Sequence, residues 1–333
     1  MVRSLPCHLI NDILNCVCAP GCRFIAVRSN AIQELARSFS RIHRLSHLET
    51  INFTFCPIND NRANSDRGSR HALQLSIFRA LVTSFRYRIP SKLTSLSLHN
   101  LRALDLPPFE SPSFQDLLKT LRYFQLSVLY DICRDERHWY MIPSRWSRFW
   151  GTVCPRMVLA PMQHALAELT LHSDFYVGTS SGLSLASLHF PHLHTLSLRN
   201  LVFEPSIGVE PFILRHATSL AKLELLTCKL PTYTGAPWIP SPPLSDPCWA
   251  SIWDRFATEL IALVSLHVDD PECSYVTLCS DLFTYSDHDF MLSISERESR
   301  DATDVVALER FHAVVAARSE EVCGESCGGT SAS

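Results

Sequence analysis

Short runs of alternating apolar and polar residues recur along the chain. Residues 93–98 read LTSLSL and residues 193–198 read LHTLSL, and residues 48–53 (LETINF) and 220–225 (LAKLEL) have the same form. Weaker copies begin at residues 121, 166 and 263. Apolar side chains two positions apart lie on one face of an extended chain. Each copy is therefore predicted to form a short strand with one buried face.

The spacing of these runs indicates a repeat. Their central apolar positions are 51, 96, 124, 169, 196, 223 and 266, which gives intervals of 45, 28, 45, 27, 27 and 43 residues. Leucine-rich repeats have a period of about 20–29 residues. The three long intervals hold the polar residues 57–70, a segment with Trp139, Trp146 and Trp150, and the proline-rich residues 231–247. We interpret these segments as loop insertions, because insertions in repeat proteins fall in loops.

Two of the copies match the full pattern L-x-x-L-x-L-x-x-[NC]-x-L. Their ninth residues are Cys56 and Cys228, and each is expected to turn the chain while its side chain faces the core. In the copies that begin at residues 93 and 193, the asparagines Asn100 and Asn200 come one place early. The pattern therefore does not carry the turn-forming role over to these two asparagines.

Helical patterns, with an apolar residue every three or four positions, fall between the strands at residues 31–42, 71–88, 114–121, 209–217, 248–263 and 301–322. Alternating strands and helices predict an α/β fold, namely an irregular leucine-rich-repeat solenoid with short parallel strands, outer helices and loop insertions. An ordinary α/β domain with leucine-rich strands is the alternative. The solenoid reading divides the chain into an N-terminal segment, a repeat array, a C-terminal capping region and a disordered tail, at residues 1–30, 31–270, 271–322 and 323–333.

The residues between the strand leucines are the predicted site. If the leucines face the core, the residues between them form the opposite, concave face of the array. Such faces are the usual binding surfaces of solenoids. We therefore predict that a protein partner is bound by Ser97, His99, Gln125, Thr170, His172, Ser197, Arg199, Glu224 and His267.

Composition narrows the classes of function. The chain has ten glycines in 333 residues and neither G-x-G-x-x-G nor G-x-x-x-x-G-K-[ST], so we expect no nucleotide or other cofactor. Its 13 cysteines are odd in number and form no C-x-x-C pair, which favours reduced thiols over a zinc site. A net charge of −3 gives no sign of a nucleic-acid partner. Because no apolar run fits a signal peptide or a membrane span, we expect a soluble cytoplasmic or nuclear protein.

One catalytic motif occurs in the chain. Residues 178–182 (GTSSG) fit G-x-S-x-G with Ser180 at the centre, and Asp269, Asp270 and His288 follow in the order of a hydrolase triad. The chain lacks a glycine-rich oxyanion loop, and glycine and serine after a strand usually form a turn. We therefore expect no enzyme, with a serine hydrolase that uses Ser180 as a remote alternative.

From residue 31 onward the chain resembles the repeat portion of uncharacterised fungal proteins of the F-box/leucine-rich-repeat type. The resemblance lies in the phrases KLTSLSLHNLRALDLPPFESPSF, from Lys92, and FPHLHTLSLRNLVFEPSIGVEPFILRHATSLAKLEL, from Phe190. Residues 5–14 (LPCHLINDIL) also resemble the start of an F-box, L-P-x-E-L-x-x-x-I-L, with His8 in place of the acidic residue. The resemblance implies that the Skp-type adaptor of a cullin-RING ubiquitin ligase is bound by Leu5, Pro6, Leu9, Ile13 and Leu14.

Later helices of an F-box are not recognisable in residues 17–30. The N-terminal segment is therefore either a degenerate or truncated F-box or a helix that caps the repeats. The sequence as a whole predicts a non-catalytic protein-interaction module. Its role is either that of a substrate-recognition subunit in an SCF-type ubiquitin ligase or that of a plain repeat scaffold with no link to ubiquitin.

Overall fold

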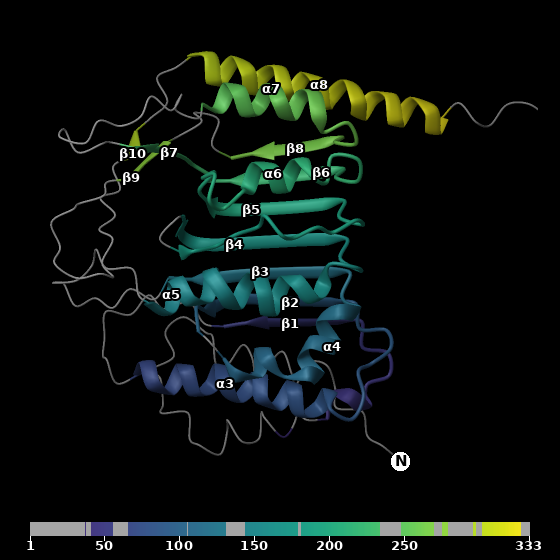
Figure 1. The fold of residues 1–333 in the computed structure, drawn as a ribbon. Helices are drawn as coiled ribbons and strands as arrows, with labels where there is room; N and C mark the ends of the chain where they lie inside the picture. The colour runs from purple at the N-terminus through teal and green to yellow at the C-terminus, as the bar shows by residue number, and fades with distance from the viewer. Residues whose placement is uncertain are drawn as a thin grey trace, which may run out of the picture.

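The computed structural model describes residues 37, 41–55, 66–104, 106–130, 144–178, 181–233, 248–269, 275–278, 296–297 and 302–327. These residues form an α/β fold around an open sheet of seven parallel strands (Figure 1). The strands are β1 (Thr50–Thr54), β2 (Ser95–Arg102), β3 (Tyr123–Leu129), β4 (Glu168–Val177), β5 (Thr195–Leu201), β6 (Lys222–Leu226) and β8 (Ser265–Val268). Their order in the sheet is their order along the chain.

The predicted strands and their alignment are confirmed by the register. One apolar row crosses all seven strands at Ile51, Leu96, Phe124, Leu169, Leu196, Leu223 and Leu266. Leu126 belongs to the next row, opposite Leu98 and Leu171. Both rows point to the same side, because the residues are two apart along each strand. A slip of one residue would turn these rows toward the other face, so the apolar pattern fixes the register.

A helical layer covers this apolar side. It contains α3 (Asp66–Phe85), α4 (Pro112–Thr120), α5 (Ser144–Arg148), α6 (Val209–Leu214) and α7 (Trp249–Glu259), and the short helices η1 (Ile42–Arg44), η2 (Pro107–Glu110), η3 (Phe149–Leu159) and η4 (Ala160–Met162), of which η3 is a π-helix. In Figure 1, α5 and α6 lie in front of the strands. Phe78 of α3 contacts the rings of Phe55, Phe109 and Phe114. Strand and helix residues thus form one continuous core.

Two of the predicted insertions are partly helical, which corrects the loop interpretation. Helix α3 begins at Asp66, inside the segment 57–70. Trp146 lies in α5 and Trp150 in η3, and their exposed fractions are 2 % and 0 %. Trp139 lies outside the described residues. The interval between β3 and β4 is long because it carries buried helical turns, which supply core side chains that a loop could not.

One backbone junction recurs at the start of the strands. The N–H groups of Thr94 and Ser95 both donate to the carbonyl of Glu49, at 3.0 and 3.1 Å. The next strand repeats this with Arg122 and Tyr123, which donate to the carbonyl of Thr94 at 2.8 and 3.0 Å. The carbonyls that accept two consecutive N–H groups in this way belong to Glu49, Thr94, Arg122, Ala167, His194 and Ala221. Every junction between neighbouring strands of the sheet therefore has the same geometry.

Polar side chains fasten the carboxyl ends of the strands. Asn100 and Asn200 have positive φ angles of 58° and 57°, and their amides donate to the carbonyls of Phe55 (3.0 Å) and Ser173 (2.7 Å) on the preceding strands. Asparagine tolerates this left-handed conformation better than most residues. The two asparagines therefore do turn the chain, contrary to the reading of the pattern. Cys228 behaves as predicted, since it is buried and its thiol donates to the carbonyl of Leu198.

The C-terminal part adds a small sheet and a long helix. Strands β7 (Leu230–Tyr233), β9 (Tyr275–Leu278) and β10 (Glu296–Arg297) form a three-stranded sheet, and β7 lies largely inside the third predicted insertion, 231–247. Helix α8 (Ala302–Cys327) packs against α7 and β8. It extends into the predicted tail, 323–333. In the described ranges, no helix has both the length and the apolar character needed to cross a membrane.

Candidate functional site: the polar face of the sheet

The face of the sheet opposite the apolar rows carries two rows of mostly polar side chains, which we call the polar face. The first row is Asn52, Ser97, Gln125, Thr170, Ser197, Glu224 and His267. The second is Thr54, His99, Ser127, His172, Arg199 and Leu226, with a break between His99 and Ser127 where the register of β2 and β3 shifts. All nine residues predicted for the binding surface lie on this face. Adjacent strands lie about 4.8 Å apart, so each row places its side chains in succession.

Accessibility varies along the polar face. Arg199 and His267 are exposed, and His99 and His172 are half-buried. Ser197, at the centre of the first row, has an exposed fraction of 3 %. A partner that approaches this face would therefore meet the long side chains of Arg199 and His267 first.

A chain of hydrogen bonds crosses three strands in the middle of the face. The Nε2 atom of His172 lies 2.9 Å from the Oγ atom of Ser197, and the hydroxyl of Ser197 bonds to the carboxylate of Glu224. This bond is the main reason that the pKa of Glu224 lies below its usual value, and Lys222, with Nζ 3.4 Å from Oε1, lowers it further. These residues come from β4, β5 and β6, so no local sequence motif contains them.

The protons that Glu224, Ser197 and His172 can supply decide which group donates in each of these hydrogen bonds. An ionised carboxylate can only accept, so Ser197 donates its single proton to Glu224. The Nε2 atom of His172 must then carry a proton and donate to Ser197. Burial lowers the pKa of His172, as does the nearby Arg199, so the ring is neutral. A catalytic triad needs the reverse arrangement, with the histidine accepting from the serine and the acid behind the histidine. The trio is therefore a structural cross-link between strands.

Further charges surround the trio. Burial lowers the pKa of His99. Burial also raises the pKa of Asp174, although the backbone N–H of Tyr130 donates to its Oδ1 at 2.6 Å. Asp269 likewise accepts from the backbone N–H of Thr227. Asp174 and Asp269 thus fasten strand ends as Asn100 and Asn200 do. The sequence pattern gave no role to Asp174, and it suggested Asp269 only as an acid of the hydrolase triad. The signal that could have found them is an Asp or Asn three to five residues after the central leucine.

Most residues of the other predicted sites lie outside the part of the chain that the structure describes. Ser180, Asp270 and His288 lie outside the described residues, as do the F-box-like residues Leu5, Pro6, Leu9, Ile13 and Leu14. Ser181, next to Ser180, is buried, and its hydroxyl donates to the carbonyl of Gly178.

Among the residues with described positions, no three His, Cys, Asp or Glu side chains are grouped so as to hold a metal ion. Cys154, Cys228 and Cys248 are not joined in disulfide bonds. Comparisons of the chain with protein-family models, with curated proteins and with solved structures give no match.

Proposed function

We propose that this protein is a non-catalytic interaction module, an irregular leucine-rich-repeat solenoid that binds a protein partner through the polar face. The observation that carries the proposal is the continuous register of the first polar row across all seven strands of the parallel sheet, in chain order. Repeat arrays stack one unit on the next and multiply outward side chains into an extended surface.

The backbone supports the repeat interpretation. The same junction, in which one carbonyl accepts two consecutive N–H groups, joins every strand of the sheet to its neighbour. The central residues Leu169, Leu196 and Leu223 are 27 residues apart and lie side by side. An ordinary doubly wound α/β domain would instead change strand order and place helices on both faces of the sheet. Here the strand order is simply sequential.

Chemistry on the polar face supports binding over catalysis. Arg199, His267 and Gln125 are donors with different reach, and Glu224 and Asp269 are acceptors within the same surface. Protein interfaces commonly combine such polar groups at their rim. The His172–Ser197–Glu224 trio uses its protons within the sheet and presents no activated nucleophile.

Site-specific photo-cross-linking tests the binding face. A photoreactive amino acid at position 199 or 267 of the full chain should cross-link one partner in cells, and the same amino acid at Arg156 on η3 in the helical layer serves as the control. The double change Arg199→Glu and His267→Glu should abolish that cross-link at a third position on the face, Gln125. Both residues are exposed, so the fold should be retained by circular dichroism. Equal labelling from position 156 would contradict the assignment of the face.

The N-terminal resemblance adds a second part to the proposal. We propose that Leu5, Pro6, Leu9, Ile13 and Leu14 dock on a Skp-type adaptor and so link the bound protein to a cullin-RING ligase. Leu5, Leu9 and Ile13 are four residues apart and would share one face of a helix. A pull-down with the purified adaptor should succeed with the wild type and fail with Leu9→Asp/Ile13→Asp. Failure with the wild type would leave a scaffold with no link to ubiquitin.

The hydrolase alternative has a direct test. A fluorophosphonate probe labels an activated serine, and we expect no labelling of Ser180 in the native protein. Labelling that disappears after heat denaturation and in Ser180→Ala would show that the protein is an enzyme.

A further inference from the structure

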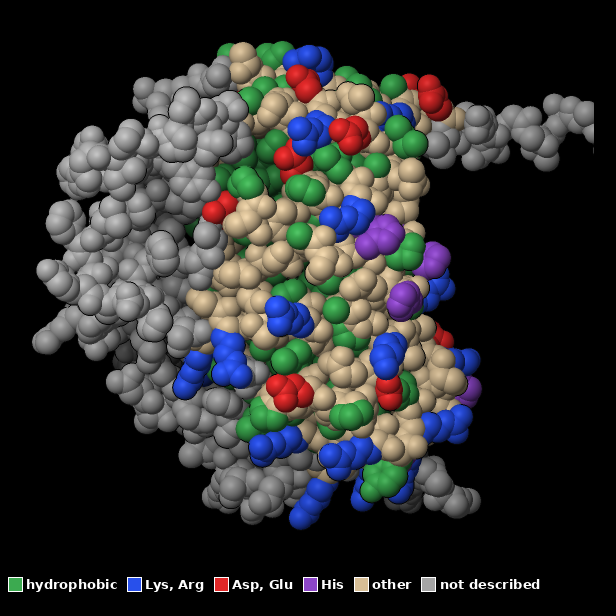
Figure 2. All heavy atoms as spheres, in the orientation of Figure 1, with side chains coloured by type: hydrophobic (Ala, Val, Ile, Leu, Met, Phe, Trp, Pro, Cys, Tyr) green, Lys and Arg blue, Asp and Glu red, His purple; other side chains and the backbone are tan. Residues whose placement is uncertain are grey.

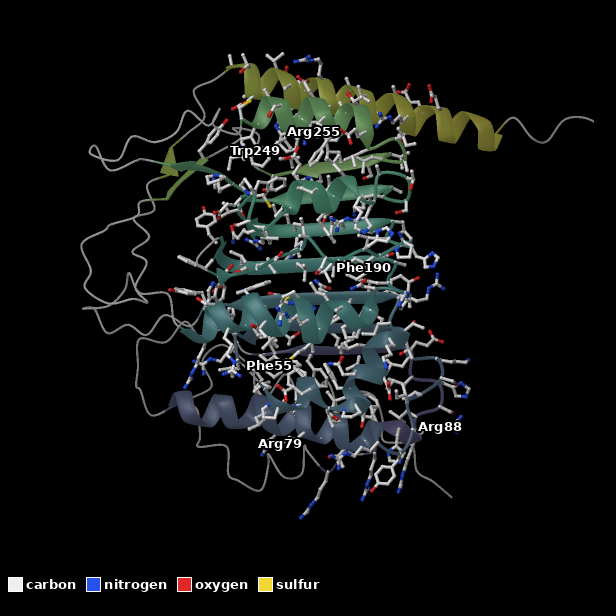
Figure 3. All side chains as sticks on the ribbon, in the orientation of Figure 1. Phe55, Arg79, Arg88, Phe190, Trp249 and Arg255 are labelled. Carbon is white, nitrogen blue, oxygen red and sulfur yellow. The ribbon has the colours of Figure 1, made fainter. Side chains whose placement is uncertain are left out.

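The end of the molecule formed by η1 and α3 is strongly basic. It carries six exposed cations, which we call the basic end: Arg41, Arg44, Arg79, Arg86, Arg88 and Lys92. Figure 2 shows Lys and Arg side chains gathered at this lower end of the molecule, and Figure 3 places Arg79 and Arg88 there and Arg255 at the opposite end. Between residues 41 and 55 and between 74 and 95, the one acidic residue is Glu49.

Tertiary contacts bring these cations together. The backbone N–H of His43, in η1, donates to the hydroxyl of Ser84 near the end of α3, at 2.9 Å. The ring of His43 also lies 5.4 Å from that of Tyr87, centroid to centroid. Arg41 and Arg44, which flank His43, are therefore held beside Arg86 and Arg88. Arg86 follows the last residue of α3, and its N–H still donates to the carbonyl of Val82 at 3.1 Å. Because Arg79 is seven residues earlier, about two helical turns, the two arginines lie on the same side.

These six cations have no anionic partner within the described part of the chain, where the ion pairs all lie elsewhere. At the opposite end, Arg255 lies 2.8 Å from Glu210, and Arg310 lies 3.5 Å from Asp254. Like charges held together without counter-charges repel one another, and a polyanion that binds them relieves this repulsion. Five of the six are arginines, whose planar guanidinium groups fit phosphate oxygens in pairs.

An exposed aromatic ring lies within the basic end. Tyr87 is 76 % exposed, between Arg86 and Arg88. Leu45, at 48 %, is the other large apolar side chain exposed there. Two such side chains offer little area for a protein interface, whose centre is apolar and poor in charge. A ring among arginines suits a nucleic-acid strand better, because bases stack on aromatic faces while phosphates contact the cations.

We infer that the basic end binds single-stranded nucleic acid, with the phosphates on Arg41, Arg44, Arg86, Arg88 and neighbouring cations and an unpaired base stacked on Tyr87. A single strand is favoured because bases within a duplex already stack on one another and leave no face for the tyrosine. This surface lies on α3 and η1 and is separate from the polar face. It would let the protein hold a protein partner and a nucleic-acid strand together.

Fluorescence anisotropy with the full-length chain and a labelled oligouridine of about 20 nucleotides tests this inference. The wild type should bind, and the logarithm of its affinity should fall linearly with the logarithm of salt concentration. Arg86→Gln/Arg88→Gln should weaken binding at least about tenfold and reduce the salt slope by roughly 0.7 for each cation removed. The control is Arg145→Gln/Arg156→Gln, an equal charge change at exposed arginines of α5 and η3, which should bind like the wild type.

Tyr87 separates stacking from simple charge attraction. Tyr87→Ala should lose about tenfold in affinity, whereas Tyr87→Phe should keep it, because the ring provides the contact. Circular dichroism should show an unchanged fold, since the side chain is exposed. The inference is wrong if the wild type fails to bind the oligouridine at low salt or if both arginine pairs act equally. It is also wrong if polyglutamate displaces the oligouridine as well as unlabelled strand does, or if only anionic vesicles bind.

Discussion

The buried ring of His216 is held in the neutral state by its surroundings. Its exposed fraction is 1 %, and both ring nitrogens have backbone partners. The N–H of Phe190 donates to Nε2 at 2.9 Å, so this nitrogen is unprotonated, and Nδ1 donates to the carbonyl of Phe212 at 2.7 Å. The contact with Phe190 requires the neutral ring, whereas the bond from Nδ1 to Phe212 can form in either protonation state. Burial is the main cause that lowers the pKa of His216 to about 4, and His189 and Arg215 add to the effect.

This pKa predicts a loss of stability in acid. A histidine has a pKa of about 6.5 in the unfolded chain, so the unfolded state binds a proton first. The contribution of the neutral ring is complete above pH 6.5 and is lost as the pH falls toward 4, by about 3 kcal/mol. Urea unfolding at pH 7 and pH 4.5 should show the loss in the wild type.

The variant His216→Phe should be less stable at pH 7, by about 1–3 kcal/mol, because two backbone groups lose their partner. Its further loss between pH 7 and 4.5 should be clearly smaller than that of the wild type. His192→Phe, at an exposed histidine, is the control and should keep the wild-type pH dependence. An unchanged pH dependence in His216→Phe would contradict the role of this ring.

At the scale of elements, side chains of α8 form hydrogen bonds with backbone groups at both ends of α7. The carboxylate of Asp304, buried near the start of α8, accepts from the backbone N–H of Ala250 in the first turn of α7, at 2.8 Å. Arg318, four turns later, donates to the carbonyls of Leu260 and Ala257 at 2.7 and 2.6 Å. A helix carries partial positive charge at its N-terminus and negative charge at its C-terminus. An acid and a base on one helix thus complement both ends of the other, and the two helices run parallel.

Removing one of these contacts should destabilise the packing of α8 on α7. Arg318→Met keeps most of the apolar stem but leaves two carbonyls without their charged donor, at a cost of about 2 kcal/mol. Arg310→Met on the same helix removes an exposed ion pair with Asp254 and should cost less than about 1 kcal/mol. Urea unfolding followed by circular dichroism measures both. Equal costs for the two variants would show that α8 is held by apolar packing alone.

For the molecule as a whole, stability should vary with position across the sheet. Leu196 and Leu266 lie in the same apolar row, but β5 has a strand on each side and β8 pairs with β6 alone. Leu196 has an exposed fraction of 0 %, whereas Leu266 is half-buried. A central strand packs against a strand on each side, so it lies in a better-packed environment than a strand at the edge of the sheet.

Leu196→Ala should therefore cost about 2–5 kcal/mol, and Leu266→Ala less than about 2 kcal/mol, because less apolar surface and a smaller cavity are involved. The free energies of unfolding from urea titrations give the comparison, and the same chemical change at both positions makes each the control for the other. Similar losses at the two positions would mean that the last strand is as tightly packed as the central ones.

The net charge of the whole chain differs in sign from the charge of one of its surfaces. The chain carries −3 overall, from which the sequence predicted no nucleic-acid partner. Folding places the cations of η1 and α3 together at one end, away from the ion-paired charges of α7 and α8. The average over the chain therefore conceals a local surface of one sign.

The sequence by itself determined the seven strands of the parallel sheet, their register and the helices α3, α4, α6, α7 and α8. It did not determine α5, η3 or the three-stranded sheet. Side chains return to the same face every two residues in a strand and every 3.6 residues in a helix. The spacing of apolar residues over a short segment therefore identifies both. The sequence also indicated that residues 97, 125, 170, 197, 224 and 267 share one face, because each follows the central apolar residue of its strand and successive side chains of a strand point to opposite faces. The left-handed turns at Asn100 and Asn200 were missed because both asparagines come one residue before the Asn or Cys position of the leucine-rich-repeat pattern.

The tertiary structure alone decided which distant residues meet. His172, Ser197 and Glu224 become a hydrogen-bonded trio only when three strands stack. Asp304 and Arg318 reach the ends of α7 only because two helices lie side by side, and Tyr87 joins Arg41 and Arg44 only because η1 docks on α3. The physical reason is that local periodicity follows from backbone geometry over a few residues. Contacts between segments depend instead on how all the apolar faces pack into one core.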